Sequence, residues 1–340
     1  MKKRIVSLVL AAAMTAAAIT GCGKLDGSAV VAEVGEEKIT ADVANFYARY
    51  QQAQYETYYA SFMGTDLWAG EAQDGKTYEE SIKESIMESL ETLYVLDAHK
   101  SEYNVELTDE EKENIKKAAE SFADANGKEE KEVISGDAAT VQKVLELLTI
   151  QEKMRVEIGK GADTEVSDEE AAQKKLQYVR FPFTTTDADG NQTTLSDEEK
   201  AELKEKAEAF KNGAADADDF EAFAKEQGYE ATSVTFDDES TSLPQNLLIA
   251  ADMLKEGEVT TVVEDTSAYY VGKLISLLDR EATDTKKTTI VSERKQELFN
   301  DTCEKWRKDA GVKVHKSTWN KIDFVKQGVT IKSTDTETEE

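Results

Sequence analysis

Hydrophobic and polar positions follow helical spacing over most of the first half of this 340-residue chain. Residues 29–39 alternate around Gly35, which predicts two short strands joined by a turn. Beyond residue 41, apolar positions recur every three or four residues, which predicts a series of helices. Their apolar stripes contain Val43, Phe46, Tyr47, Tyr50, Ile82, Ile86, Leu90, Leu93, Val141, Val144, Leu145 and Leu148.

The pattern changes near residue 164. Residues 176–183 and 268–277 alternate and are rich in Tyr, Val and Phe, and residues 259–263 are mostly apolar, so we predict three strands. Helical spacing lies between the first strand and the other two, at residues 196–210, 219–227 and 245–255. This order of elements predicts an α+β domain.

The C-terminal part returns to helical spacing over residues 285–310. Residues 312–314 and 324–331 predict short strands, and the polar, acidic residues 333–340 predict a disordered tail. We interpret Cys303 as a small apolar residue on the buried side of the helix.

Three Ser/Thr-x-x-Glu sequences begin at Thr108, Ser167 and Ser196 and predict capping boxes that open helices. The acidic pairs in them lie in first helical turns, where the helix dipole favours negative charge. We therefore interpret these pairs as structural groups and not as catalytic carboxylates; they are Glu110/Glu111, Asp168/Glu169 and Glu198/Glu199.

The N-terminus has the pattern of an export signal. Three basic residues precede the apolar stretch 5–19, which is shorter than the ~20 residues that a spanning helix needs. The following Ile-Thr-Gly-Cys, residues 19–22, resembles the bacterial lipobox. The resemblance implies removal of residues 1–21, fatty acylation of Cys22 and attachment to the outer face of the cell membrane. An ordinary signal peptide with a chance Cys is the alternative.

Charge and residue counts restrict the possible chemistry. The chain has 41 basic and 70 acidic residues, and the stretch 1–21 holds three basic residues and no acidic one, so the chain from Cys22 onward carries a net charge of −32. Such a charge repels nucleic acid, which excludes it as a partner. The only histidines are His99 and His315, and the only other cysteine is Cys303. We therefore expect no metal site and no cofactor.

Three segments together resemble the PrsA-like and SurA-like foldase lipoproteins, which contain a parvulin-type peptidyl-prolyl isomerase domain. Val31–Thr40 is similar to the opening of these foldases, Asp219–Lys225 to a parvulin helix that begins with an acidic-Phe pair, and Leu254–Thr260 to a later parvulin element. The resemblance implies an α+β fold: a mostly helical chaperone body, SurA-like at its N-terminus, into which a parvulin-like domain is inserted.

The implied division of the chain has six parts. They are a signal peptide (1–21), a lipid-anchored tether (22–28), a helical chaperone domain (29–163), a parvulin-like domain (164–281), a C-terminal helix and strands that pack on the chaperone domain (282–332) and the tail (333–340). The implied function is that of a membrane-anchored extracytoplasmic foldase. Its partners would be unfolded exported polypeptides and, through Cys22, the membrane. Its reaction would be cis/trans isomerisation of the peptide bond before proline, which is slow enough to limit folding.

The sequence departs from active parvulins at both family histidines. Tyr178 stands at the first position and Tyr270 at the second, and the family's glycine-rich loop is missing around residues 237–244. A tyrosine hydroxyl both donates and accepts hydrogen bonds, so this pair is a candidate for a residual active site. The alternative is that both are strand tyrosines in a core, so isomerase activity stays open.

An aromatic run from Phe46 to Phe62 is the candidate client-binding segment. We predict that Tyr55, Tyr58 and Tyr59 contact clients, because tyrosine offers a large contact area at low conformational cost. Phe46 and Tyr50 are expected in the core.

Three other functions compete with a foldase. The first is a holdase chaperone without catalysis. The second is a solute-binding lipoprotein, which would need βαβ units that the pattern lacks. The third is a structural envelope or adhesion lipoprotein.

Overall fold

The structure, a computed structural model, describes residues 14–16, 25–59, 67–186 and 190–332. Cys22, Phe62 and the tail 333–340 lie outside the described residues. The chain divides into two compact units, unit 1 (1–162 and 294–340) and unit 2 (163–293). The division falls inside one long helix, α10 (Arg280–Ala310), between residues 293 and 294, whereas the sequence placed a boundary nearer the start of this helix, at residues 281/282.

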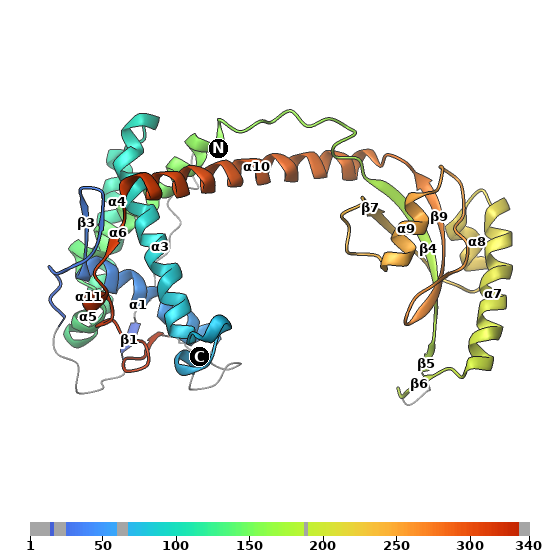
Figure 1. Cartoon of the computed structure of the whole chain (residues 1–340), viewed down its shortest axis with the longest axis horizontal. Helices are drawn as coiled ribbons and strands as arrows, with labels where there is room; N and C mark the ends of the chain where they lie inside the picture. The colour runs from blue at the N-terminus through green and yellow to red at the C-terminus, as the bar shows by residue number, and fades with distance from the viewer. Residues whose placement is uncertain (1–13, 17–24, 60–66, 187–189, 333–340) are drawn as a thin grey trace, which may run out of the picture. The chain divides into compact units, whose positions relative to one another are not determined.

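Unit 1 is mostly helical (Figure 1). Its elements are β1 (Met14–Ala16), β2 (Val30–Val34), β3 (Glu37–Thr40), α1 (Ala41–Tyr58), η1 (Leu67–Ala69), η2 (Gln73–Gly75), α3 (Tyr78–His99), η3 (Lys100–Tyr103), α4 (Asp109–Ala125), α5 (Lys128–Ile134), α6 (Ala138–Gly159), the end of α10, β10 (Lys313–Val314), α11 (Lys316–Trp319) and β11 (Val329–Ile331). Thr108 and Glu111 form the predicted capping box at the start of α4, and Thr77 and Glu80 form another before α3.

The N-terminal and C-terminal segments of unit 1 share one core. Strand β10 pairs with β2, which pairs with β3, so a C-terminal segment completes the N-terminal sheet. The same core contains Phe46 and Leu90 from the N-terminal helices and Cys303 and Phe324 from the C-terminal part. Burial raises the pKa of Cys303 to about 11, so this thiol is neutral and behaves as a small apolar side chain.

Unit 2 is built on a four-stranded antiparallel sheet with the strand order β7-β4-β9-β8. Its elements are β4 (Lys174–Pro182), β5 (Thr184–Thr186), β6 (Gln192–Thr194), α7 (Asp197–Asp216), α8 (Phe220–Glu226), β7 (Ala231–Phe236), α9 (Gln245–Asp252), β8 (Val263–Glu264), β9 (Ala268–Ser276) and the start of α10. The predicted α+β fold class is confirmed by this combination of helices and antiparallel strands.

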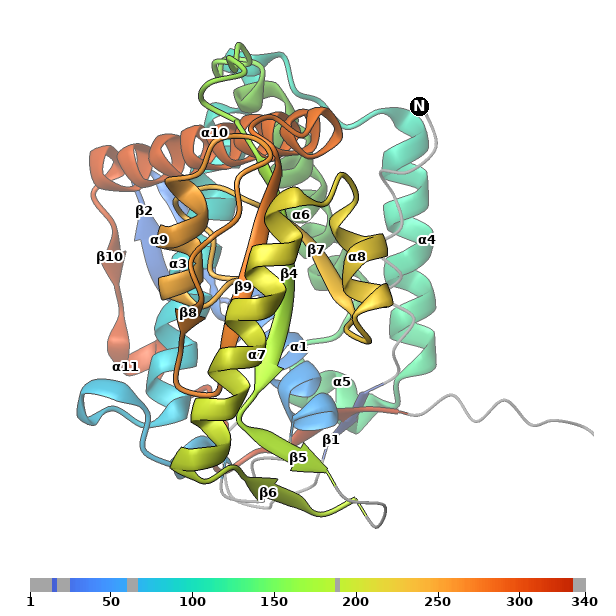
Figure 2. The same cartoon turned by 90° about the vertical axis from the view of Figure 1, so that its right-hand side faces the viewer.

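Helices cover both faces of this sheet (Figure 2). Helices α7 and α8 pack on one face, where Phe210 and Phe220 meet Val179 and Phe181 of β4. Helix α9 packs on the opposite face. Because side chains alternate along a strand, every second residue of β4 and β9 points toward α9, and these residues form the α9 face of the sheet.

Several local predictions were wrong. Ser167 does not open a helix: residues 168–171 form a turn, in which the Glu170 backbone N–H donates to Ser167 Oγ at 3.1 Å. The short strand β7 and the hairpin β5–β6 were missed. Only residues 329–331 of the predicted strand 324–331 are extended, because the chain before them curves over α1 through hydrogen bonds to buried side chains.

Candidate functional site

The two tyrosines predicted for the isomerase site lie together on the α9 face of the sheet. In the pairing of the central strands, Tyr178 of β4 stands opposite Gly272 and Tyr270 of β9 stands opposite Arg180. The tyrosines are diagonal neighbours, and their ring centroids are 5.9 Å apart at an interplanar angle of 58°. Tyr270 is buried and Tyr178 is half-buried, so the pair lies where the core meets the surface.

Arg180 joins this pair, and the sequence analysis missed it. Its Nε donates to Tyr270 Oη at 3.3 Å, and its Nη2 donates to Ser267 Oγ at 3.3 Å. A hydroxyl that accepts from a cationic donor becomes a better donor itself, because the two hydrogen bonds polarise the same O–H group. The signal was available in the sequence, since residues two apart on a strand share a face.

The surroundings of the tyrosine pair are apolar. The core on the α9 face contains Leu176, Phe236, Leu243, Leu247, Leu248, Ala251, Val263, Ala268, Tyr270 and Leu274, with Tyr178 packed against it. Gly272, opposite Tyr178, packs closely on this core, because a Cβ at this position would lie 3.0 Å from Leu176 Cδ1. The two hydroxyls and the guanidinium therefore lie beside an apolar core whose side chains are buried.

The tyrosines predicted to bind clients lie at the end of α1 in unit 1. Tyr58 is 63% exposed and Tyr59 is 51% exposed, while Tyr55 is half-buried. The rings of Tyr55 and Tyr59 lie 5.7 Å apart, and Tyr55 meets Trp68 edge-on at 5.9 Å. Trp68 in turn meets the buried Phe324 at 4.9 Å. We call Tyr55, Tyr58, Tyr59, Trp68 and Phe324 the aromatic ladder. Its ring contacts lead from the exposed Tyr59 through Tyr55 and Trp68 to Phe324 in the core.

Glu56 connects the aromatic ladder to strand β11 in the C-terminal part of the chain. Its Oε1 accepts from Trp68 Nε1 at 2.8 Å and from Gln52 Nε2 at 2.6 Å, and its Oε2 accepts from the Val329 backbone N–H at 2.8 Å. Trp68 and Val329 are both buried. The Glu56 carboxylate therefore fixes the position of Trp68 relative to strand β11.

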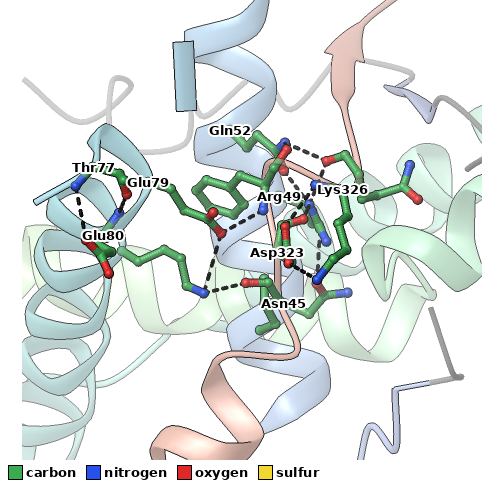
Figure 3. Close-up of polar contacts among 12 residues, drawn as sticks. Asn45, Arg49, Gln52, Thr77, Glu79, Glu80, Asp323 and Lys326 are labelled. Atoms are coloured by element: carbon green, nitrogen blue, oxygen red, sulfur yellow. Dashed lines mark hydrogen bonds and ion pairs between the residues drawn. The ribbon is translucent and has the colours of Figure 1, made fainter. Parts of the chain in front are cut away.

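A buried polar network holds the C-terminal segment against α1 (Figure 3). Arg49, only 5% exposed, donates through Nη1 to the backbone carbonyls of Asp323 at 3.2 Å and Gln327 at 2.9 Å. Gln52, fully buried, also donates to the Gln327 carbonyl, at 2.7 Å. These side chains supply the partners that a non-helical backbone needs when it is buried.

Helix α3 holds the same segment from a second direction. Glu79 accepts from the Phe324 backbone N–H at 2.8 Å, and Lys83 donates to the Ile322 carbonyl. Burial lowers the pKa of Lys83, although Glu79 at 3.6 Å opposes this shift. Together with Phe46 in the core and Tyr50 half-buried against it, this packing bears out the expectation that the first part of the aromatic run is core.

Among the residues that the structure describes, no helix is long and apolar enough to span a bilayer.

No protein-family model matches the chain, and no curated protein does. Among solved structures, the foldase protein PrsA from Streptococcus pneumoniae str. Canada MDR_19A is 22% identical and covers 76% of this chain and 97% of its own, with a TM-score of 0.32. The peptidylprolyl isomerase PrsA from Bacillus cereus is 17% identical and covers 75% and 97%, with a TM-score of 0.30.

A third similar structure comes from a description of PEB4 and Cj1289 as two SurA-like chaperones of Campylobacter jejuni. It is 12% identical and covers 84% of this chain and 98% of its own, with a TM-score of 0.29. These neighbours are PrsA and SurA-like proteins, the class that the sequence motifs resemble.

Proposed function

We propose that the chain is an extracytoplasmic foldase that binds unfolded exported polypeptides from a lipid anchor at Cys22. The observation that carries the proposal is the aromatic ladder, in which the exposed Tyr59 packs on Tyr55, Tyr55 on the buried Trp68 and Trp68 on Phe324, with the exposed Tyr58 next to Tyr59 in the chain. Neighbouring exposed apolar side chains, in contrast to single ones, often mark an interaction site on a soluble protein. An unfolded polypeptide, with its own exposed apolar side chains, is a partner that suits such a site.

The rigid base of the ladder favours this use. Tyr55 packs on Trp68, and Glu56 holds the indole N–H at 2.8 Å, so little side-chain freedom is left to lose on binding. The net charge of −32 beyond the signal peptide keeps a protein with exposed tyrosines soluble. Tyrosine contacts depend little on the partner's sequence, which suits a protein with many clients.

The lipobox at residues 19–22 supports an anchored location. Residues 23–28 would connect the lipid to unit 1 and span at most about 3.5 Å each, so unit 1 would stay close to the membrane where exported chains emerge. Two or more acyl chains on one residue give firm attachment, whereas one chain is marginal.

The experiment that tests client binding is suppression of aggregation. The soluble chain from residue 22, with Cys22→Ser, is mixed with thermally unfolding citrate synthase, and light scattering is followed. We expect suppression that falls at least threefold in the double variant Tyr58→Ser, Tyr59→Ser. Val156→Ser is the matched control, because Val156 on α6 is also exposed, at 58%. No suppression by the unaltered chain, or equal losses in the control, would refute the proposal.

A second function, prolyl isomerisation by unit 2, is favoured by one observation: Tyr178, Tyr270 and Arg180 converge on an apolar face. Rotation about the amide bond is helped by an apolar site for the proline ring and by donors that stabilise the twisted amide. A proline-peptide isomerisation assay decides between a foldase with catalysis and a holdase. Activity that is unchanged in the double variant Tyr178→Phe, Tyr270→Phe would remove both hydroxyls from the reaction.

A further inference from the structure

Strand β1 occupies a groove on unit 1 that the sequence does not predict. It pairs antiparallel with β11, with Met14 opposite Ile331, Thr15 opposite Thr330 and Ala16 opposite Val329 (Figure 2). Met14 is fully buried and belongs to the core of unit 1. Its backbone N–H donates to Asn126 Oδ1 at 2.7 Å. The groove therefore takes both the backbone and an apolar side chain of an extended segment.

The two edges of β11 are used differently. Its inner edge is bound to α1, because the Val329 N–H donates to Glu56 Oε2 at 2.8 Å and the Ile331 N–H donates to Thr57 Oγ1 at 2.9 Å. Successive residues of a strand direct their backbone groups to opposite sides. The N–H and C=O of Thr330 therefore point outward, to β1. Strand β11 is held in place from one side and pairs from the other.

The strand that fills this groove is part of the predicted signal peptide. Cleavage before Cys22 would remove Met14–Ala16 and leave the pocket of Met14, the Asn126 oxygen and the outer edge of β11 without these partners. An open strand edge beside an apolar pocket is a template for pairing with another chain.

We propose that in the mature protein this groove binds an extended segment of an unfolded client, which adds to β11 as a strand and places an apolar side chain in the Met14 pocket. The proposal rests on the foldase function and on the signal-peptide cleavage proposed above, and it assigns a binding site to that function. In the full-length chain, β1 stands in for the client.

The chemistry of the groove suits a sequence-tolerant site. Main-chain hydrogen bonds to Thr330 and Asn126 are available to any extended segment, and one pocket selects an apolar side chain. The groove also adjoins the aromatic ladder, because Thr57, which holds Ile331, directly precedes the exposed Tyr58. A second copy of the chain is disfavoured as the occupant, because two chains of net charge −32 repel each other.

The test measures binding of a fluorescein-labelled peptide with the sequence of residues 12–18 to the chain from residue 22 with Cys22→Ser, by fluorescence anisotropy. We expect saturable binding that weakens at least tenfold in Thr330→Pro, which removes the outward N–H, and at least threefold in Asn126→Ala. Thr330→Val keeps the N–H and should bind as the unaltered chain does. A peptide with Asp in place of Met14 should not bind.

A second arm keeps the test independent of variant folding. Methylation of the Thr15 amide in the peptide removes a donor to Thr330 without altering the protein, and it should weaken binding at least tenfold. Unfolded citrate synthase should displace the labelled peptide. The site would be refuted if the peptide did not bind, or if its affinity were unchanged by both Thr330→Pro and the methylated amide. A dimer in sedimentation that dissociates in Thr330→Pro would also refute it.

The outcomes separate this site from the foldase function. Suppression of aggregation without peptide binding would leave the foldase proposal intact and refute the groove. Peptide binding without any suppression of aggregation would refute the foldase proposal and, with it, unfolded clients as the occupant of the groove.

Discussion

Arg180 Nε donates a hydrogen bond of 3.3 Å to Tyr270 Oη across the two central strands of the unit 2 sheet. The register that pairs these residues also makes Tyr178 a diagonal neighbour of Tyr270. The positive charge therefore acts on the Tyr270 hydroxyl, beside the apolar core on the α9 face of the sheet.

Removal of this cation tests whether the tyrosine pair works as a site. If the unit isomerises prolyl bonds, Arg180→Ala should lower kcat/KM for a proline peptide about tenfold, because the Tyr270 hydroxyl loses the donor that polarises it. Arg180→Lys should retain part of the rate, since it keeps the charge but not the fork of donors. Equal rates in all three proteins would show that Arg180 has no part in the reaction. Arg180 is exposed, so the melting temperature should change little.

The buried network at Arg49 predicts a large loss of stability in unit 1. Arg49→Met should lower the free energy of unfolding by about 3 kcal/mol, because the Asp323 and Gln327 carbonyls lose a charged donor while they stay buried. Urea unfolding followed by circular dichroism measures the change. The exposed Lys117 of α4, which pairs with Glu113, is the control, and Lys117→Met should change stability by less than about 1 kcal/mol. Equal losses of stability in the two variants would show that the Arg49 hydrogen bonds do not stabilise unit 1.

Asp237 predicts how unit 2 responds to acid. Burial opposes its ionisation, but hydrogen bonds from Lys286, Ser240 and Gln173 outweigh burial and lower the pKa to about 2. A pKa lowered in the folded state gives stability that is present above the ordinary value of 3.8 and is lost as the pH falls through about 2. The contribution at neutral pH is about 2 kcal/mol.

Asp237→Asn should remove this contribution. Compared with the unaltered chain, the variant should be less stable at pH 7 and nearly equal at pH 2, as measured by urea unfolding at each pH. A constant difference at every pH would show that the carboxylate charge does not matter.

Lipidation of Cys22 has a direct chemical readout. Mass spectrometry of the membrane fraction should find a mature N-terminus at Cys22 that carries fatty acyl groups. Cys22→Ser should stop processing and leave the protein with residues 1–21 attached. Cleavage at another bond, or an unmodified Cys22, would remove the anchor from the account.

Local sequence signals predicted much of the fold. The capping boxes at Thr108 and Ser196 open α4 and α7 as expected, because the signal lies within four residues. The predicted strands 176–183 and 268–277 correspond to β4 and β9. The helix predicted to begin after Ser167 does not form, because the chain turns there and enters β4 only a few residues later.

Features that depend on distant partners were not predictable. Strand β7 was missed although Thr, Val and Phe favour strands, because it has only six residues and its pairing with β4 is needed to distinguish it from a loop. In the sequence, Arg49 and Gln52 look like ordinary polar positions of a helix. Both donate to the Gln327 carbonyl, which lies 278 and 275 residues away along the chain. Tyr178 and Tyr270 were predicted from a resemblance, and the spacing along the strand could have placed Arg180 on the same face as Tyr178. That Arg180 stands opposite Tyr270 depends on the strand register, which the sequence does not give.

The central claim is that the chain assists folding, and refolding of a client tests it most directly. A chemically unfolded protein with a slow, proline-limited phase is diluted into buffer with and without the soluble chain from residue 22 carrying Cys22→Ser. The account predicts a higher yield of native client, which falls in the double variant Tyr58→Ser, Tyr59→Ser, and a faster slow phase, which is lost in the double variant Tyr178→Phe, Tyr270→Phe. An unchanged yield together with an unchanged slow phase would contradict it.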